Sequence, residues 1–255
     1  MRSAVTRRQL IVVEEPPSNR LADVLSAVRG DERVRLVLNE GRKLAGAVNT
    51  GMRHAVTEYT GILLGDDMWA PAAVDVLSRC IERSPEVDFF HSSRVIIDEH
   101  DRPISPVYPA RERFTLANFV KGSPVKHLLC WKRSAGLAIG GLDETLNSVG
   151  PDDYDFPWCM AEAGLRFEAI SDCLYLYRDH RESFRLTTHL PQSTHTRELR
   201  RILRKHGLGA LRVERAVARA RATYLQQCLY RSHLDRRVKE RFGLDPRRGW
   251  RQKYE

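Results

Sequence analysis

Two groups of acidic residues are the strongest candidates for chemistry in this chain. The first is the pair Asp66-Asp67, which follows the apolar run Ile62-Leu63-Leu64 and precedes Pro71. The run predicts a buried strand, and ligands of open α/β sheets bind at the carboxyl ends of strands. Carboxylates are also the hard oxygen ligands that Mg²⁺ or Mn²⁺ prefers, usually together with substrate phosphates. The alternative is an acidic turn that caps a helix beginning near Pro71.

The second group is Asp152-Asp153-Tyr154-Asp155. Carboxylates so close together raise one another's affinity for protons, and a raised pKa suits a general base. The alternative is structural, because Asp152 or Asp153 stands where it can cap the helix that the pattern predicts over residues 152–163.

Alternating strands and helices must position these groups. Apolar and β-branched runs predict the strands, and apolar residues at helical spacing predict the helices between them. The first strands are expected at residues 10–13, 34–38, 61–64 and 87–90, with helices at residues 20–28, 41–56 and 72–83. This alternation predicts an α/β fold with a mostly parallel sheet flanked by helices.

The pattern is less regular after residue 91. Strands are predicted at residues 94–97, 128–132, 166–170 and 174–177, and a short helix at residues 114–120. From residue 194 to about residue 242 the spacing is helical, with an interruption near Gly207 and Gly209.

Length and composition set the class of protein. A chain of 255 residues is long enough for one well-packed core and a small extra module. No apolar stretch approaches the roughly 18 residues that a transmembrane helix needs, and the N-terminus lacks the apolar core of a signal peptide. The five cysteines are scattered and form no CxxC pair. We therefore expect a cytoplasmic protein with reduced thiols.

Charge is distributed unevenly along the chain. Residues 181–255 hold 20 Lys and Arg against 7 Asp and Glu, whereas residues 1–180 hold 22 against 26. Such a basic tail can contact nucleic acid, anionic lipid or an acidic partner, or can be a solvated helix surface. Nucleic acid is not expected as a partner, because the tail has no aromatic stacking pattern and no standard reader motif.

The tail also has an apolar face. Its apolar residues predict a helix or helix pair that packs on the body of the protein or on a second copy, which makes a homodimer through these helices an open alternative. The basic flanking faces also permit weak contact with an anionic membrane surface.

Several stretches, in the right order over residues 8–185, resemble the GT-A-type glycosyltransferases of family 2. They are Val37–Gly41 with Asn49-Thr50-Gly51, Leu63–Asp67, Ile97-Asp98-Glu99, Gly140–Glu144 with Asp152–Asp155 and Trp158, and Tyr177-Arg178-Asp179-His180. The resemblance implies a GT-A (Rossmann-like) fold and an inverting, metal-dependent, hexosyltransferase-type enzyme. Such an enzyme moves a sugar from a UDP-, GDP- or dTDP-sugar to a hydroxyl acceptor, with Mg²⁺ or Mn²⁺ as cofactor.

The resemblance also implies roles for individual residues. Asp153 takes the position of the general base, Asp66 that of the metal ligand, and His180 that of a second group reaching the metal or diphosphate. The donor-side positions are Glu14, Glu15, Lys43, Asn49, Asp66, Asp67 and Arg178, and the acceptor-side positions are Asp152 and Trp158.

The chain departs from the family pattern in three places. Leu64 stands where the first Asp of the usual DxD would be, and Val48 where an Arg often precedes the Asn. The chain also begins at what resembles the family's second strand, without a counterpart of the opening strand and helix before Arg7. These departures leave a catalytically silent GT-A-like binding or scaffolding protein as the alternative function.

The expected organisation is a GT-A-like domain at residues 1–193, with a donor half at about 7–97 and an acceptor half at about 98–193. A basic helical C-terminal extension follows at residues 194–255.

Overall fold

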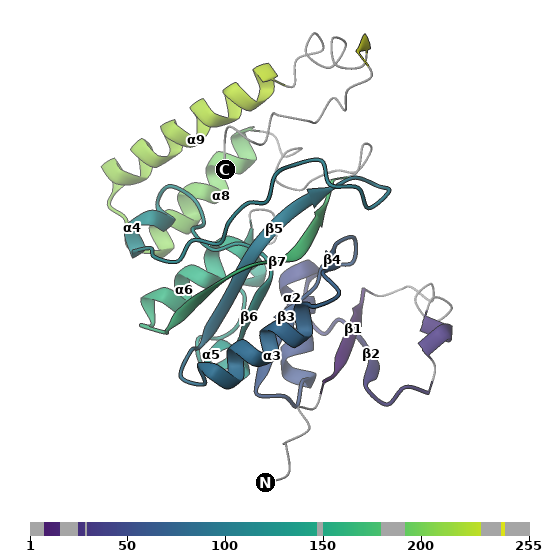
Figure 1. Ribbon diagram of the computed structural model, residues 1–255. Helices are drawn as coiled ribbons and strands as arrows, with labels where there is room; N and C mark the ends of the chain where they lie inside the picture. Colours follow the sequence, from purple (N-terminus) through teal and green to yellow (C-terminus); the bar gives the residue numbers. More distant parts are fainter. Residues whose placement is uncertain are drawn as a thin grey trace.

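A computed structural model of the chain describes residues 8–15, 25–28, 30–146, 150–179, 192–230 and 241–242. Within these residues the fold is α/β, with helices on both faces of a central sheet and a separate strand pair beside it (Figure 1). The strands are β1 (Leu10–Glu14), β2 (Val34–Leu38), β3 (Tyr59–Ile62), β4 (Met68–Trp69), β5 (Phe89–Ile97), β6 (Leu129–Lys132) and β7 (Phe167–Arg178). The α-helices are α2 (Lys43–His54), α3 (Ala73–Arg83), α4 (Leu116–Phe119), α5 (Arg133–Ala138), α6 (Phe156–Glu162), α8 (Gln192–Lys205) and α9 (Ala210–Tyr230). Short turns of other helical types are η1 (Leu25–Val28), η2 (Glu144–Leu146) and the π-helical turn η3 (Pro151–Asp155).

The central sheet has the strand order β3-β6-β5-β7-β4, and β1 pairs in parallel with β2 in a sheet of their own. β5 and β7 are parallel, whereas β6 runs antiparallel to both β3 and β5, and β4 runs antiparallel to β7. The α/β class is therefore as predicted, whereas the expected mostly parallel sheet is wrong in this detail: β5 and β7 are the one parallel pair of the described central sheet. Antiparallel neighbours need no helical crossover between them, so β6 and β4 can join the sheet without one.

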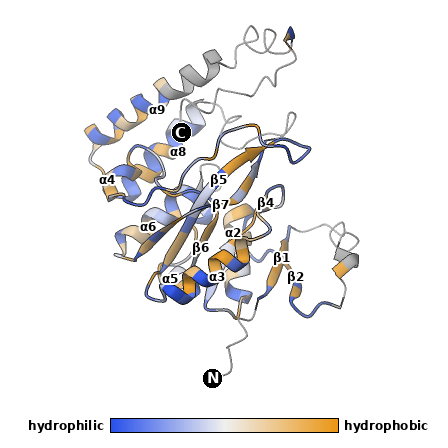
Figure 2. Cartoon of the chain, viewed as in Figure 1, coloured by the Kyte–Doolittle hydropathy of each residue, from blue (hydrophilic) through white to orange (hydrophobic). Residues whose placement is uncertain are grey.

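Alternation along the strands divides the core into two layers. Phe89 and Trp131 belong to a large cluster on one face of the sheet, and their neighbours Phe90 and Cys130 belong to a smaller cluster on the other. Successive side chains of a strand point to opposite faces, so each strand supplies both clusters. The smaller cluster is covered by α3, and the strands that separate the clusters are largely hydrophobic (Figure 2).

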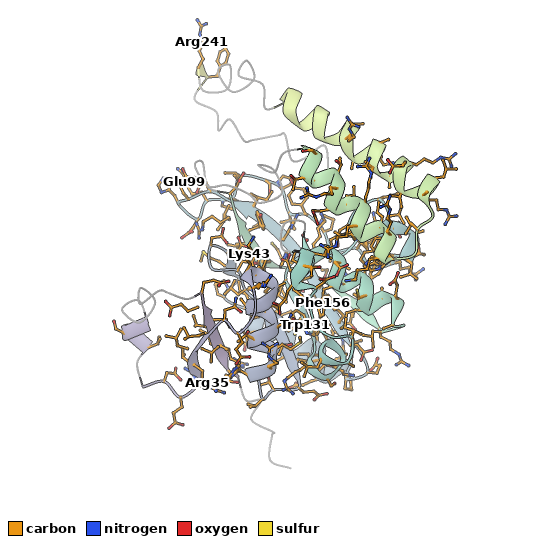
Figure 3. All side chains as sticks on the ribbon, turned by 180° about the vertical axis from the view of Figure 1, so that it is seen from behind. Arg35, Lys43, Glu99, Trp131, Phe156 and Arg241 are labelled. Carbon is orange, nitrogen blue, oxygen red and sulfur yellow. The ribbon has the colours of Figure 1, made fainter. Side chains whose placement is uncertain are left out.

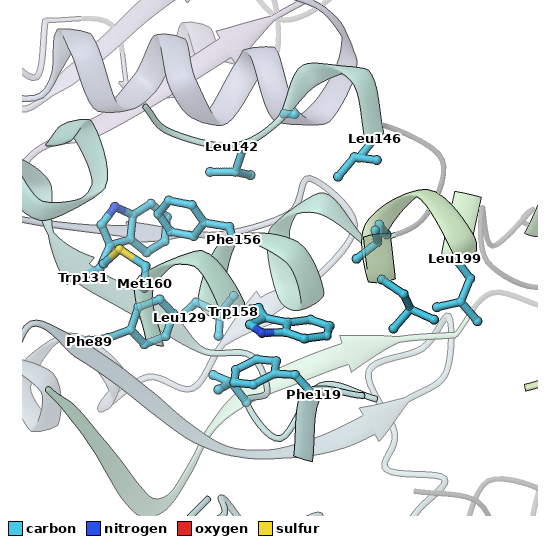
Figure 4. Packing of buried hydrophobic residues seen from close by; sticks show 14 of the residues in the cluster. Phe89, Phe119, Leu129, Trp131, Leu142, Leu146, Phe156, Trp158, Met160 and Leu199 are labelled. Carbon is cyan, nitrogen blue, oxygen red and sulfur yellow. The ribbon is translucent and has the colours of Figure 1, made fainter. Parts of the chain in front are cut away.

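The large cluster includes the C-terminal helices. Residues of α2, α6, α8 and α9 meet the sheet there, and Figure 4 shows Trp158 of α6 lying over Phe119, with Leu199 of α8 beyond it. Ile202 and Val213 are fully buried in this cluster. The expectation that the tail packs on the body is thus confirmed for the described parts of α8 and α9.

Several element boundaries differ from the sequence-based expectation. β3 ends at Ile62, and Leu63 is 45% exposed, so Asp66 follows a short loop and not a strand end directly. β5 and β7 are each one continuous strand where two were predicted, and α5 and β4 were not predicted. Residues 20–24 of the first predicted helix lie outside the described residues.

None of the helices that the structure describes combines the length and the apolar character that a bilayer span requires. Cys80, Cys130, Cys159 and Cys173 are free cysteines.

Candidate active site

The Asp66-Asp67 pair lies on the loop between β3 and β4, and its two members have different environments. Asp66 is exposed, whereas Asp67 is 8% exposed. The Asp67 carboxylate accepts hydrogen bonds from the Tyr175 hydroxyl at 2.7 Å and from the backbone N–H of Arg178 at 2.7 Å. Burial raises the pKa of Asp67, and these two hydrogen bonds oppose the rise. α3 begins without a side-chain cap, so the expected alternative of a capping role for the pair is not what the structure shows.

A tyrosine and a histidine connect this loop to the second acidic group. The ring of Tyr175, whose hydroxyl binds Asp67, lies 5.0 Å from the ring of His127 between centroids. His127 Nε2 in turn lies 3.2 Å from Oδ2 of Asp152, and both side chains are buried. Asp67 and Asp152, distant in sequence, are therefore joined through two packed rings.

The second acidic group occupies the π-helical turn η3, which leads directly into α6. The backbone N–H groups of Tyr154 and Asp155 both donate to the carbonyl of Gly150, at 3.1 and 3.2 Å. Gly150 has φ 53°, and a Cβ at this position would lie 2.6 Å from Oδ1 of Asp153. Only glycine fits there without moving that carboxylate. Turns of this kind are frequent at functional sites.

The three carboxylates of the turn differ in their partners. Asp152 pairs with His127, and Asp155 pairs with Lys205 at 2.8 Å and with His206 at 3.1 Å. Within the described part of the chain, the Asp153 carboxylate has no hydrogen-bond partner. Asp153 therefore does not act as a helix cap, which was the structural alternative.

The pKa values of the pair Asp152 and Asp153 are shifted in opposite directions. Burial alone would raise the pKa of Asp152, but the hydrogen bond and charge of His127 outweigh it and lower the pKa. Burial and the neighbouring charge of Asp152 raise the pKa of Asp153. One carboxylate is thus held ionised while its neighbour has a raised affinity for a proton, as a general base requires.

Arg178 and Asp98 fix the end of β7 beside the Asp66 loop. The Arg178 guanidinium donates to the backbone carbonyls of Asp66 at 2.8 Å and Asp98 at 2.9 Å, and pairs with Asp101. Burial would raise the pKa of Asp98, but hydrogen bonds from Arg102 and His100 lower it to about 2. Arg178 thus holds the loop, and the expected position of His180 lies outside the described residues.

The donor-side residues lie at the ends of β1 and β2 and at the start of α2. Glu14 is 5% exposed, and its Oε1 is buried without a hydrogen-bond partner among the described residues. Glu15 accepts a hydrogen bond from Asn39 at 2.8 Å, and Asn39 also donates to the carbonyl of Lys43 at 3.0 Å. Lys43 is exposed at the first position of α2, with a positive φ of 51° that is uncommon for lysine (Figure 3).

Asn49 connects α2 to the Gly140–Glu144 loop. Its side chain donates to the carbonyl of Leu142 at 2.9 Å and to Glu144 at 3.1 Å, and accepts from the N–H of Leu142 at 2.8 Å. The Glu144 carboxylate also accepts from the N–H of Arg42 at 2.9 Å. All these bonds are internal, so Asn49 positions the Gly140–Glu144 loop.

Trp158 does not occupy the acceptor-facing position expected from the sequence. The residue is 2% exposed. Its ring stacks on Phe119 at 5.4 Å and on His206 at 3.9 Å between centroids. Trp158 lies on the inner face of α6. Its side chain packs against Phe119 of α4 and against His206 at the end of α8, and so presents almost no surface to an acceptor.

Four residues of the site were not found by sequence reasoning: His127, Tyr175, Lys205 and His206. They contact the acidic groups across long stretches of sequence, as Tyr175 does with Asp67 over 108 positions. The one signal in the sequence was a polar side chain at a predicted strand: His127 directly precedes the strand predicted at residues 128–132, and Tyr175 lies in the one predicted at residues 174–177.

The fold and the site define an α/β protein of the GT-A glycosyltransferase class. The model of the family described as Glycosyl transferase family 2 matches residues 4–133, which is half of the chain. The chain therefore belongs to glycosyl transferase family 2. No curated protein matches its sequence.

Solved structures agree on the fold. TarS residues 1–349 from S. aureus, in complex with UDP-GlcNAc, has 15% identity and a TM-score of 0.59, covering 84% of this chain and 62% of that one. The mannosyltransferase PcManGT from Pyrobaculum calidifontis, in complex with GDP-Man and Mn²⁺, has 18% identity and a TM-score of 0.54, covering 83% of this chain and 59% of that one. The chain thus spans less than two thirds of the length of these structures.

Proposed function

We propose that this protein is an inverting glycosyltransferase of the hexosyltransferase type that moves a sugar from a nucleotide-sugar donor to a hydroxyl acceptor. The observation that carries the proposal is the convergence of the Asp66-Asp67 loop and the η3 turn, joined through Tyr175 and His127, with Asp153 lacking a hydrogen-bond partner among the described residues. Family membership supports the reaction class.

Asp153 is the proposed general base. Its carboxylate accepts the proton of the acceptor hydroxyl while the hydroxyl oxygen bonds to the anomeric carbon of the sugar. The bond from that carbon to the diphosphate breaks, and the nucleoside diphosphate leaves with the electron pair. His127 keeps Asp152 ionised beside it, and burial together with that charge raises the pKa of Asp153, which increases its affinity for a proton.

Asp66 is the proposed ligand of a divalent cation, Mg²⁺ or Mn²⁺. The exposed carboxylate of Asp66 fits such an ion, because hard oxygen ligands suit both metals. Asp67 is buried, and its oxygens accept hydrogen bonds from Tyr175 and Arg178. A bound cation would neutralise charge on the diphosphate leaving group. Asp67 holds the loop, Arg178 fixes its backbone, and His180 is proposed as a second residue at the ion.

The donor is proposed to lie along the ends of β1 and β2 and the start of α2. Glu14 and Glu15 stand where the resemblance implies contacts to the nucleobase and ribose of the donor. Lys43 and the N-terminus of α2 offer positive charge to its phosphates. Complexes of the structural neighbours with UDP-GlcNAc, with UDP and with GDP-Man and Mn²⁺ support a UDP- or GDP-sugar, with a dTDP-sugar as a further candidate. The hydroxyl acceptor is proposed to approach from the side of Asp152 and Asp153.

Nucleotide titration with and without metal tests the proposal. UDP, GDP and dTDP are titrated by calorimetry into the full chain in the presence of Mn²⁺ or of EDTA, and a panel of nucleotide sugars is screened for Mn²⁺-dependent hydrolysis. We expect tight binding of one nucleotide only with Mn²⁺, lost in Asp66→Asn and kept in Asp75→Asn, which removes an exposed carboxylate on α3.

If no nucleotide binds in a metal-linked manner, the alternative of a catalytically silent GT-A-like scaffold replaces the proposed function. If binding depends on the metal but is equally tight in Asp66→Asn and in the unsubstituted chain, the proposed reaction class stands. Asp66 is then not the metal ligand.

A further inference from the structure

The C-terminal end of α8 contacts the acidic turn η3 directly. Lys205 Nζ donates to Oδ2 of Asp155 at 2.8 Å and to Oδ2 of Asp143 at 3.0 Å. His206 Nε2 lies 3.1 Å from Oδ1 of Asp155, and its Nδ1 lies 2.8 Å from the Glu162 carboxylate. Two consecutive residues of the C-terminal extension thus hold both carboxylate oxygens of Asp155.

This contact is buried. The side chains of Asp155 and His206 are each 1% exposed, while Lys205 is 36% exposed. Burial alone would lower the pKa of Lys205, but its hydrogen bonds to Asp155 and Asp143 outweigh burial and raise it. A buried carboxylate deprived of its charged partner is strongly destabilised, so the position of Asp155 depends on α8.

The turn transmits this position to Asp153. Asp155 is the last residue of η3, and its backbone N–H closes the turn on the carbonyl of Gly150 at 3.2 Å. His127 holds the other end of the turn through Asp152. Asp153 lies between these two anchors and has no hydrogen-bond partner of its own among the described residues, so the backbone of the turn sets the direction of its carboxylate.

We propose that Lys205 and His206 are positioning residues for Asp153, so that the end of α8 is part of the acceptor side of the active site. The proposal rests on the proposed function of Asp153 as the general base. Lys205 and His206 touch no reacting atom. They fix Asp155, and through it the turn that presents Asp153.

A metal ion is the competing explanation for the same cluster. One ligand atom from each of Asp155, Cys159 and His206 lies within 4.8 Å of the others. However, the Lys205 ammonium already bonds to Oδ2 of Asp155, and an ammonium at that place repels a second cation. The cluster is therefore assigned to an ion-pair network.

The first test measures the turn itself and needs no substrate. Hydrogen exchange of the backbone amides of residues 150–160 is compared in the full-length unsubstituted chain, Lys205→Met, His206→Phe and Arg204→Met. His206→Phe keeps an aromatic ring to stack on Trp158, and Arg204→Met removes a neighbouring charge that is exposed on the same helix. We expect faster exchange at Tyr154 and Asp155 in Lys205→Met and His206→Phe, and no change in Arg204→Met. Unchanged exchange in Lys205→Met, or an equal increase in Arg204→Met, overturns the proposal.

The second test separates positioning from general loss of structure. With UDP-N-acetylglucosamine and GDP-mannose as the donor probes, Lys205→Met is expected to lower kcat about tenfold to a hundredfold, as misplacement of a reacting group does, while nucleotide affinity and donor KM stay within about twofold. Lys205→Arg, which keeps the positive charge, is expected to retain most of the kcat that Lys205→Met loses. In an Asp153→Asn background, Lys205→Met is expected to cause no further loss, because it acts through Asp153.

The outcomes distinguish the two proposals. If Asp153→Asn is inactive while Lys205→Met retains full kcat, the positioning role is overturned and the proposed function stands. If the unsubstituted chain hydrolyses no nucleotide sugar of the panel, the proposed function fails. If Asp153→Asn is fully active, Asp153 is removed as the general base. In both cases the exchange experiment alone still decides whether α8 holds the turn.

Discussion

Asp153 carries its charge in a place that disfavours it. Burial and the charge of Asp152 raise its pKa above the ordinary value of 3.8, so the folded protein binds this proton more tightly than the unfolded chain does. The resulting stabilisation is fully present below the unfolded pKa and is lost as pH rises through the raised folded pKa. Above that pH the ionised carboxylate lowers the stability of the fold. A general base needs this ionised form for its activity, so such a cost is expected at a catalytic position and not at a structural one.

The prediction at this scale concerns Asp153→Asn. We expect kcat to fall about 10²- to 10⁴-fold, the usual contribution of a general base. We also expect Tm to rise relative to the unsubstituted chain at pH 8, with the difference shrinking as pH falls toward 4, because the amide resembles the protonated carboxyl group. Calorimetric melting across this pH range, with nucleotide-sugar hydrolysis at each pH, provides both measurements.

Asp172→Asn, which removes an exposed carboxylate on β7, is the matched control. Parallel melting curves for Asp153→Asn and the unsubstituted chain at every pH would contradict the buried charge. Retained kcat would remove Asp153 as the base.

The lengths of β5 and β7 show where sequence reasoning was insufficient at the scale of elements. His91-Ser92-Ser93-Arg94 interrupts the apolar pattern of β5, which is why two strands were predicted. In the fold these polar residues are buried, and the two serines find partners outside the strand: Ser92 Oγ accepts from the N–H of Leu128 at 3.0 Å, and Ser93 Oγ accepts from the N–H of Ala110 at 2.9 Å. Local pattern cannot reveal partners that distant parts of the chain supply.

The same limit applies to the site. The motifs located Asp66 and Asp153 because each is part of a short, ordered segment. The contacts that fix them come from other elements, such as β7 for Asp67 and α8 for Asp155. Trp158 failed as an acceptor residue for the converse reason, since its position in a motif did not reveal that it faces inward on α6.

The C-terminal helices are expected to unfold together with the body. Ile202 of α8 is fully buried in the large core cluster, although it lies in the proposed helical extension and not in the proposed GT-A-like domain. Ile202→Ala should therefore lower the free energy of unfolding by about 2–5 kcal/mol, the usual cost of such a cavity. We expect urea unfolding to show a single transition, with the same midpoint whether it is monitored by far-UV circular dichroism or by tryptophan fluorescence.

Leu211→Ala is the control, because Leu211 lies on α9 and is 66% exposed. A substitution at such an exposed position should change the free energy of unfolding by about 0.5 kcal/mol or less. If Ile202→Ala instead produced a separate early transition with the main one unchanged, α8 and α9 would be an independent unit, and the boundary proposed at residue 194 would also be a boundary of stability.

The whole molecule combines a mildly acidic body with a basic C-terminal part, and α9 shows how the charge is arranged. Val213, Ala216 and Val217 face the core, while Arg212 and Arg215 are exposed. The arginines therefore lie on the outer faces of a helix that is anchored to the body, as the sequence predicted. Dimerisation through these helices stays a prediction, and the mass of the full chain in solution decides it.

Weak contact with an anionic membrane surface is a further prediction for the basic faces of this helix. Each Lys or Arg near such a surface contributes about 1 kcal/mol of attraction, so Arg212→Glu with Arg215→Glu should weaken binding to phosphatidylserine-containing vesicles at least about tenfold. Arg79→Glu with Arg111→Glu, at exposed positions outside the helical extension, makes the same change in net charge and should weaken binding much less. Because the Debye length falls to about 3 Å at 1 M salt, binding measured by co-sedimentation should disappear there. Binding that persists at high salt, or on vesicles of phosphatidylcholine alone, would show that charge on α9 does not bring the protein to a membrane.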